Sequence, residues 1–356
     1  MFYKLSSNGA KNFIGVRDFT LDTLSNFLYD VKKVSFVLLN PDQRYKNHLS
    51  SALRLSRISL IFEESSIRTF TGFKFAAEAL GARIHEIPTG MYSSYVPSRD
   101  NLPELLRYIR DLGVDAFVVR IGRNNKYSME QIVNMLDDDE STVSIFSAGE
   151  TGKSQPSQTL CDLYTVWNVF GDKFGQGGLR YVFVGDIEKS PTIHDFIRIL
   201  CLVGARSITL VSNDNAKLPN DLAELVKNAG IPLTETYELL STSEKNDVFY
   251  FTQFAPIPIQ IQALEVDSPT IHGDKIRSEY SLKYGVTNEF LRLLPCTARV
   301  IHPGPVGNEF KMVPNLHRDP RFLHGKTMTI NGFLTKVTLL LSSLNQNFYP
   351  IAPIVK

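Results

Sequence analysis

The sequence predicts an α/β protein with two domains, each built on a parallel sheet. Its 356 residues correspond to about two domains of ordinary size. Short apolar runs alternate along the chain with segments of helical periodicity, and strands separated by helices are typical of parallel sheets. The composition, 43% hydrophobic and 21% charged, suits a globular protein with substantial cores.

The first half of the chain contains four strand-like runs with helix-like segments between and after them. The expected strands are RISLIF, ARIHEIP, DAFVVRIG and TVSIFSAG. The expected helices are FTGFKFAAEALGA, NLPELLRYIRDLG and QTLCDLYTVWNVFG. Gly81 ends the first of these helices and Gly113 the second, as glycine commonly does after the last helical turn.

A second α/β series follows the glycine-rich linker GDKFGQGG (171–178). Its expected strands are LRYVFVGD, SITLVSN, DVFYFTQ and TARVIHPGP, and its helices are TIHDFIRILCLVGA and DLAELVKNAG. We therefore expect a first domain over 1–154, a connecting helix over 155–171, a second domain over 172–330 and a C-terminal helix over 331–356 that packs back on the first domain.

Charge and cysteine content exclude several classes of protein. With 38 basic and 37 acidic residues the net charge is +1, so a general nucleic-acid binder is not expected and any anion site must be local. The three cysteines are far apart, without metal-ligand spacing or a disulfide framework. No signal peptide or membrane-spanning run is evident. We expect a cytoplasmic protein with no metal, no cofactor and no membrane partner.

Polar residues follow several of the predicted strands. Ser66–Thr69 come after RISLIF, Arg120 after DAFVV, Gln155–Gln158 after TVSIF, and His302–Pro305 after ARVI. Ligands of open α/β sheets bind beyond the carboxyl ends of the strands. These four segments are therefore the expected ligand site.

The segment at residues 66–69 stands at the start of a predicted helix. A helix N-terminus offers unpaired N–H groups and the positive end of the macrodipole. Ser66 and Thr69 add hydroxyls, and Arg68 adds a planar fork that matches phosphate oxygens. Simple helix capping by the serine or threonine is the alternative. Arg120 at another strand end, in a nearly neutral protein, favours anion binding.

These segments together resemble the aspartate and ornithine carbamoyltransferase family. Ser66-Ile67-Arg68-Thr69 is similar to the Ser-x-Arg-Thr carbamoyl-phosphate signature. The segments that agree in order and spacing are Arg120, Gln155–Leu160, Gly185-Asp186 and His302–Pro305, and RSEY at Arg277–Tyr280 resembles the mobile loop of the aspartate branch. The His-Pro-x-Pro form favours that branch.

The resemblance implies transfer of a carbamoyl group from carbamoyl phosphate to a small amine or amino acid. The first domain would bind carbamoyl phosphate and the second the acceptor, in a homotrimer whose sites are shared between subunits. The phosphate would be held by Ser66, Ile67, Arg68, Thr69 and Arg120. Arg68 and Thr69, with Gln155, would polarise the carbamoyl oxygen, while Gln158 and the carbonyls of Pro303 and Gly304 would hold its NH₂ group.

The sequence departs from the family on both sides of the reaction. Gln155 replaces a histidine that donates to the carbamoyl oxygen; its amide can still donate, but as a neutral group. On the acceptor side, Pro191 and Gln253 stand where the aspartate branch has arginines, and Ala255 where it has a glutamine. Charge-assisted hydrogen bonds to a dicarboxylate would be lost, so an acceptor other than L-aspartate is expected.

Other acceptor-side residues are assigned by the same comparison of motifs. Lys189 is the obvious substitute cation, and His194 matches a family histidine that is equally explained as structural. Glu64 is retained without its usual arginine partners, so it is expected to face a cationic or amino group. In the loop 89–101, Ser93 or Ser94 and the cation Arg99 would enter a neighbouring subunit's site, with a solvated arginine as the alternative.

Three functions remain open on this basis. The first is a carbamoyltransferase with a non-aspartate acceptor, in specialised metabolism. The second is an aspartate carbamoyltransferase of pyrimidine biosynthesis with substituted carboxylate ligands, Lys189 among them. The third is a non-catalytic paralogue that binds a phosphate metabolite. The joint presence of Gln158 and His302–Pro305 favours catalysis.

Overall fold

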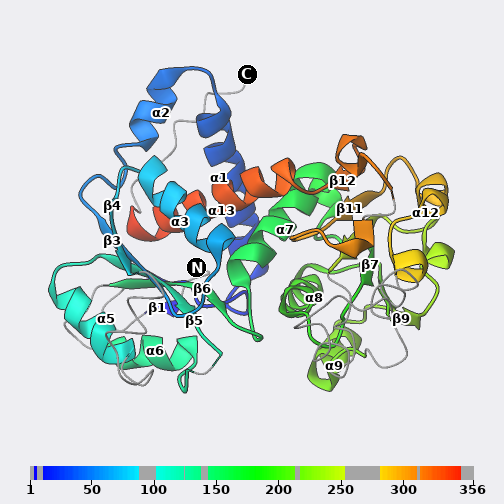
Figure 1. Ribbon diagram of the computed structural model, residues 1–356, viewed down its shortest axis with the longest axis horizontal. Helices are drawn as coiled ribbons and strands as arrows, with labels where there is room; N and C mark the ends of the chain where they lie inside the picture. The colour runs from blue at the N-terminus through cyan, green and yellow to red at the C-terminus, as the bar shows by residue number, and fades with distance from the viewer. Residues whose placement is uncertain are drawn as a thin grey trace, which may run out of the picture. The chain divides into compact units, whose positions relative to one another are not determined.

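The chain divides into two compact units, Met1–Tyr164 with Ile330–Lys356, and Thr165–Thr329 (Figure 1). The computed structural model describes residues 4–5, 11–87, 102–123, 125–137, 143–212, 217–252, 281–310 and 313–345, without the side chains of residues 4, 5, 172 and 308. Within these ranges, no helix has the length and apolar character needed to cross a bilayer.

The first unit is built on four parallel strands in the order β4-β3-β5-β6. These strands are β3 (Arg57–Phe62), β4 (Arg83–Ile87), β5 (Ala116–Ile121) and β6 (Ser144–Glu150). Every residue of β5 is buried, as expected for a central strand of a parallel sheet covered on both faces. The short strands β1 (Lys4–Leu5) and β2 (Lys11–Asn12) form a separate antiparallel pair.

The accompanying helices are α1 (Leu21–Leu39), α2 (Gln43–Leu49), α3 (Ile67–Ala79), α5 (Leu102–Asp111) and α6 (Met129–Leu136). Helices α5 and α6 lie side by side on one face (Figure 1), where Leu106 and Ile132 share a buried core with Phe117 of β5. Helix α1 begins with a capping box between Thr20 and Thr23, which satisfies N–H groups that the first turn leaves unpaired.

The second unit is built on six parallel strands in the order β12-β11-β10-β7-β8-β9. The strands are β7 (Arg180–Val184), β8 (Ser207–Val211), β9 (Leu233–Thr236), β10 (Val248–Phe251), β11 (Arg299–Ile301) and β12 (Phe322–Leu323). The accompanying helices are α8 (Pro191–Val203), α9 (Asn220–Asn228) and α12 (Asn288–Leu293). Short 3-10 turns occupy Gly171–Lys173, Leu240–Thr242, Asn308–Phe310 and Leu316–Arg318.

Aromatic side chains fill the core of the second unit. On one face, the Phe290 ring of α12 meets Phe249 and Phe251 of β10 edge to face, with centroids 5.3 Å and 6.0 Å apart. On the other, Phe196 of α8 packs against Tyr250 at 5.3 Å. Such offset and edge-to-face pairs add about 0.5–1.5 kcal/mol each beyond their buried area.

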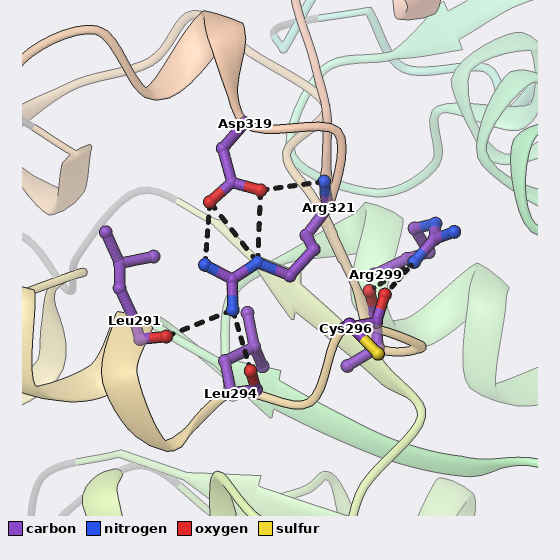
Figure 2. A network of polar contacts seen from close by, with 7 residues as sticks. Leu291, Leu294, Cys296, Arg299, Asp319 and Arg321 are labelled. Atoms are coloured by element: carbon purple, nitrogen blue, oxygen red, sulfur yellow. Dashed lines mark hydrogen bonds and ion pairs between the residues drawn. The ribbon is translucent and has the colours of Figure 1, made fainter.

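A polar network holds the segment between α12 and β12 (Figure 2). Arg321 forms a two-pronged pair with Asp319, in which Nη2 lies 2.7 Å from Oδ2. Its Nη1 donates to the carbonyls of Leu291 and Leu294, at 3.0 and 2.7 Å. The arginine thus satisfies carbonyls that the end of a helix leaves unpaired.

Two helices belong to both units along the sequence: α7 (Pro156–Phe170) and α13 (Lys326–Leu344). The predicted fold class is confirmed, and each run that was predicted to be a strand contains one. Helices α1, α2, α6 and α12 and strands β1, β2, β9 and β12 were not predicted from the sequence. The C-terminal helix begins at Lys326, five residues before its predicted start at 331.

Candidate active site

Three of the predicted segments lie at the same edge of the first sheet. Strands β3, β5 and β6 are neighbours and run parallel, so their carboxyl ends lie together. Ser66–Thr69 follow β3, Arg120 is in the last part of β5, and Gln155 follows β6. The topology therefore brings these residues to one edge, as expected.

The serine at the start of α3 is not used as a cap. Ser66 occupies the N-cap position, but its side chain accepts no hydrogen bond from the first turn. Its Oγ donates instead to Oγ1 of Thr69, at 3.0 Å. Ile67, the first helical residue, is 78% exposed, so the backbone at the helix start is open to solvent. The capping alternative does not explain Ser66, and the free N–H groups suit an anion.

Arg68 lies in the first turn of the same helix and is exposed. Burial lowers the pKa of its guanidinium, and the carboxylate of Asp162 opposes that shift. A guanidinium keeps its charge throughout the physiological range. Arg68 is therefore a charged fork that a ligand at the helix N-terminus can reach.

Arg120 is 9% exposed, and its Nε is buried without a hydrogen-bond partner. Its Nη1 donates to the carbonyl of Ala148 at 3.2 Å and to Oε1 of Gln155 at 3.3 Å. Burial lowers the pKa of Arg120, and nearby Glu64 raises it. An unpaired buried donor costs about 1–3 kcal/mol, so this arginine would gain from an anionic ligand.

Gly149, in β6, gives Arg120 and Gln155 the space to meet. Its φ is +112°. A Cβ there would lie 2.9 Å from Nη1 of Arg120 and 2.9 Å from Oε1 of Gln155. A side chain at this position would be strained and would push the two polar groups apart. Because Oε1 of Gln155 accepts from Arg120, the NH₂ end of the carboxamide is the end left to donate elsewhere.

The carboxamide of Gln158 is oriented by a residue one helical turn later. Its Nε2 donates to Oδ1 of Asp162, at 2.8 Å, and Asp162 is fully buried. This contact leaves Oε1 of Gln158 as an acceptor. An acceptor is what the NH₂ of a carbamoyl group requires.

Glu64 has partners within the first unit, and its expected contact with an amino group of the acceptor stays a prediction. Its Oε1 accepts from the backbone N–H of Arg123 at 2.7 Å. That hydrogen bond, a second one from Thr151 and the charges of Arg120 and Arg123 outweigh burial and lower the pKa of Glu64. The carboxylate therefore holds the turn after β5. This contact could not be predicted from the sequence, because the partner is a backbone group.

In the second unit, His302 fixes the backbone of the predicted Pro303-Gly304 pair. Nδ1 of His302 accepts from the N–H of Gly304 at 2.8 Å, so the other ring nitrogen carries the hydrogen. That Nε2 lies 2.7 Å from Oε1 of Glu309, although the N–H is poorly aligned with it. Both side chains are almost fully buried. The loop after β11 is thereby held by a buried histidine and carboxylate.

The predicted acceptor residues of the second unit follow β7. Pro191 is the first residue of α8, which Ser190 caps. His194 is satisfied by the carbonyl of Ile187, 2.7 Å from its Nε2, which supports its structural interpretation. Lys189 is exposed, and its backbone N–H donates to Asp186. The remaining predicted residues lie outside the described part of the chain: Ser93, Ser94, Arg99, Gln253, Ala255 and Arg277–Tyr280.

Sequence reasoning missed three residues that shape these segments, namely Gly149, Asp162 and Glu309. The spacing of Gln158 and Asp162, one helical turn apart, was a usable signal. Gly149 lies against Arg120 of another strand as well as Gln155, and Glu309 acts within the loop that holds His302 and Gly307; neither arrangement has a characteristic spacing.

Comparison with known proteins agrees with this geometry. Residues 11–168 match the family described as aspartate/ornithine carbamoyltransferase, carbamoyl-P binding domain. The aspartate carbamoyltransferase catalytic subunit of Thermococcus onnurineus is 24% identical over 331 residues, covering 93% of this chain and 96% of that protein. The corresponding subunit of Methanothermobacter thermautotrophicus is 28% identical over 243 residues, 68% of this chain and 72% of the relative.

Solved structures match the fold over nearly the full length. The aspartate transcarbamoylase catalytic subunit of M. jannaschii superposes with a TM-score of 0.76 at 22% identity, covering 94% of this chain and 98% of that one. The enzyme of Trypanosoma cruzi in complex with carbamoyl phosphate gives 0.76 at 20% identity, covering 96% and 98%. Residues 11–168 thus resemble the carbamoyl-P binding domain of the aspartate/ornithine carbamoyltransferases, and the chain has the transcarbamoylase fold over nearly its full length.

Proposed function

We propose that this protein transfers the carbamoyl group of carbamoyl phosphate to an amine. One observation carries the proposal: the buried, unpartnered Nε of Arg120 lies at the sheet edge where α3 begins with an unused serine cap. The guanidinium of Arg120 and the backbone at the start of α3 both offer hydrogen-bond donors, and an anion would accept from them. They belong to the residues that match the carbamoyl-P binding domain.

The donor side of the reaction follows from the contacts of each residue. Ser66, Ile67, Arg68, Thr69 and Arg120 bind the phosphate and stabilise it as it leaves. The NH₂ of Gln155, directed away from Arg120, donates to the carbamoyl oxygen, where negative charge builds in the tetrahedral state. Oε1 of Gln158 accepts from the carbamoyl NH₂, as do the carbonyls of Pro303 and Gly304. Catalysis on this account consists of positioning and electrostatic stabilisation.

The comparisons favour L-aspartate as the acceptor. The relatives named above are aspartate carbamoyltransferases, and the Trypanosoma cruzi enzyme has been solved with aspartate and phosphate. On this alternative, the chain binds the two carboxylates with groups other than the family's arginines. Lys189 is the cation that the described part of the second unit offers near the start of α8.

A less acidic amine is the second candidate, and a different observation favours it. Pro191 begins α8 at the position where the resemblance places an arginine, and proline has no side-chain donor. Gln253 replaces the other arginine. Two charge-assisted contacts of about 1.5–3 kcal/mol each would be missing. An acceptor with less negative charge loses less binding free energy when these two contacts are missing.

We further propose a homotrimer, in which Ser93 or Ser94 and Arg99 enter the neighbouring subunit's site. The family match supports this assembly. Light scattering at micromolar concentration measures it directly, and a mass of one subunit would contradict it.

The phosphate site is tested by calorimetric titration of carbamoyl phosphate into the wild type and Arg68→Ala. We expect binding in the wild type and its loss in the variant, because the phosphate then lacks its main fork. Arg54→Ala is the matched control: this exposed arginine precedes β3 and so lies at the opposite edge of the sheet. Equal affinity in Arg68→Ala and Arg54→Ala would overturn the assignment.

A further inference from the structure

A buried lysine lies behind the phosphate site, on a helix that the sequence analysis did not connect with it. Lys336 belongs to α13 and is 8% exposed. Its Nζ donates to the carbonyl of Gly332, at 3.1 Å. The ammonium also lies 5.5 Å from the centre of the Phe73 ring. A lysine is almost never buried to this extent unless its charge is paired or used.

Two glycines allow the lysine to reach a contact between three helices. A Cβ on Gly72 of α3 would lie 3.1 Å from Cδ and Cε of Lys336. A Cβ on Gly332 of α13 would lie 3.5 Å from Sγ of Cys161 and 3.7 Å from Nζ of Lys336. The ammonium is therefore adjacent to α3, α7 and α13 at once.

Residues of the proposed site occupy the facing turns of those helices. Arg68 is four residues before Gly72, so the two lie on the same face of α3. On α7, Asp162 follows Cys161 and holds the carboxamide of Gln158 at 2.8 Å. Asp162 attracts both cations, since its charge acts on Arg68 and on Lys336. The charge of one fully buried carboxylate thus acts on two cations.

We propose that Lys336 is a positioning residue of the carbamoyl-phosphate site, which acts through Asp162 on Arg68 and Gln158. With the ammonium present, Asp162 does not neutralise Arg68 alone, and the guanidinium keeps a net charge for the phosphate. Without the ammonium, Asp162 pairs fully with Arg68 and draws its guanidinium away from the helix N-terminus. The guanidinium then competes with Gln158 for the carboxylate that orients its carboxamide. This inference rests on the phosphate-site assignment proposed above.

The charge of Lys336 gives the proposal a pH signature. Burial lowers the pKa of this lysine, Cys161 and Asp162 raise it, and Arg68 lowers it further. A lysine with a lowered pKa loses its charge at a pH where an arginine in its place remains charged. Phosphate affinity of the wild type should therefore fall, relative to Lys336→Arg, as the pH rises toward the ordinary lysine range.

The test is calorimetric titration of inorganic phosphate into the wild type, Lys336→Met and Lys336→Arg. We expect Lys336→Met to bind roughly tenfold more weakly, equivalent to about 1.4 kcal/mol, and Lys336→Arg to bind as the wild type at neutral pH. The ratio of wild-type to Lys336→Arg affinity should fall as the pH rises. Because both proteins bind the same phosphate, the ionisation of phosphate affects both affinities equally and cancels in the ratio. Turnover should show the loss in KM for carbamoyl phosphate more than in kcat.

Lys11→Met is the matched control. Lys11 also donates to α13, at the carbonyl of Ser342, and burial lowers its pKa as well. Ser342 is ten residues beyond Gly332 on α13, which places this contact more than two helical turns from Lys336's own. Equal losses in Lys11→Met and Lys336→Met, or a pH-independent affinity ratio, would overturn the role of Lys336. If Lys336→Met does not fold, the pH dependence of the ratio of wild-type to Lys336→Arg phosphate affinity still tests the role of Lys336. Failure of the wild type to bind phosphate would instead refute the proposed function.

Discussion

Nη1 of Arg120 lies 3.3 Å from Oε1 of Gln155, and this hydrogen bond links a strand end to the residue that precedes α7. The contact gives the carboxamide a fixed direction, because its Oε1 is the end that faces Arg120. Gly149 makes the approach possible. The chain thus has a neutral carboxamide at the position where the resemblance places a histidine.

Gly149→Ala should damage the site more than it damages the fold. The new Cβ would meet Arg120 and Gln155 at 2.9 Å, on a backbone with φ of +112°. We expect a loss of about 1–3 kcal/mol in stability from the strained backbone and at least about tenfold weaker binding of carbamoyl phosphate. Gly152→Ala is the control, since its φ is +78° and nothing lies within 4 Å of its Cβ. Similar affinities in the two variants would contradict the role of Gly149.

Gln155→Ala should lower kcat by about 10²-fold, the usual effect of removing one donor to a developing oxyanion. Gln155→His should restore part of the rate and add an inflection near the ordinary histidine pKa of about 6.5, which the wild type lacks at this position. The measurement is kcat against pH for the three proteins. A Gln155→Ala variant as fast as the wild type would remove this residue from the mechanism.

Glu309 should make the protein sensitive to acid. Burial raises its pKa, but contacts with His302, its own backbone and Gly307 together outweigh burial, so the pKa is lowered from 4.5. A lowered folded-state pKa contributes stability that is complete above about 4.5 and is lost as pH falls through the folded value. We expect the free energy of unfolding of Glu309→Gln to vary less with pH in this window. Parallel pH profiles for the two proteins would show that Glu309 is not responsible.

Arg321→Ala should destabilise the second unit, because the arginine holds Asp319 and two carbonyls at the end of α12 (Figure 2). Both side chains of the pair are mostly buried, at 18% and 21% exposure, so we expect a loss of about 2 kcal/mol. Arg299→Ala, which removes hydrogen bonds to Cys296 and Ala298 only, should cost less. Denaturant unfolding of both variants gives the comparison; a larger effect of Arg299→Ala would contradict this ranking.

The acceptor candidates are separated by the KM for L-aspartate. If Pro191 and Gln253 leave two ionic contacts unmade, at about 1.5–3 kcal/mol each, aspartate should bind roughly 10²–10⁴-fold more weakly than an acceptor that needs neither contact. Turnover with aspartate is compared with ornithine, diaminopropionate and simple amines. A millimolar KM for aspartate that Lys189→Ala abolishes would show instead that the arginines were replaced.

The sequence allowed the fold class to be predicted, and also the meeting of the candidate phosphate-binding residues at one sheet edge, because both rest on local signals. The β3, β5 and β6 runs are apolar and bounded by turns, and the edge rule then gathers Arg68, Arg120 and Gln155. The helix α1 was overlooked although Leu24, Phe27 and Val31 are buried on one face. The two-residue strand β12 has no pattern to detect.

The partners of the site residues could not be predicted, since they depend on contacts between distant segments. Glu64 was expected to lack its usual arginine partners, and the backbone N–H of Arg123 that binds it could not be foreseen. The contact of Lys336 with Gly72 joins residues 264 positions apart. Neither has a spacing in the sequence that distinguishes it from ordinary helix and loop composition.

The central claim is carbamoyl transfer at the edge formed by β3, β5 and β6, and phosphate release tests it most directly. Carbamoyl-phosphate-dependent release is followed in the wild type and Arg68→Ala, with and without each amine of the panel, L-aspartate included. The account predicts that an amine accelerates release in the wild type, with formation of the carbamoylated amine, and that Arg68→Ala abolishes the acceleration. Release that no amine accelerates, or that Arg68→Ala leaves unchanged, would contradict it.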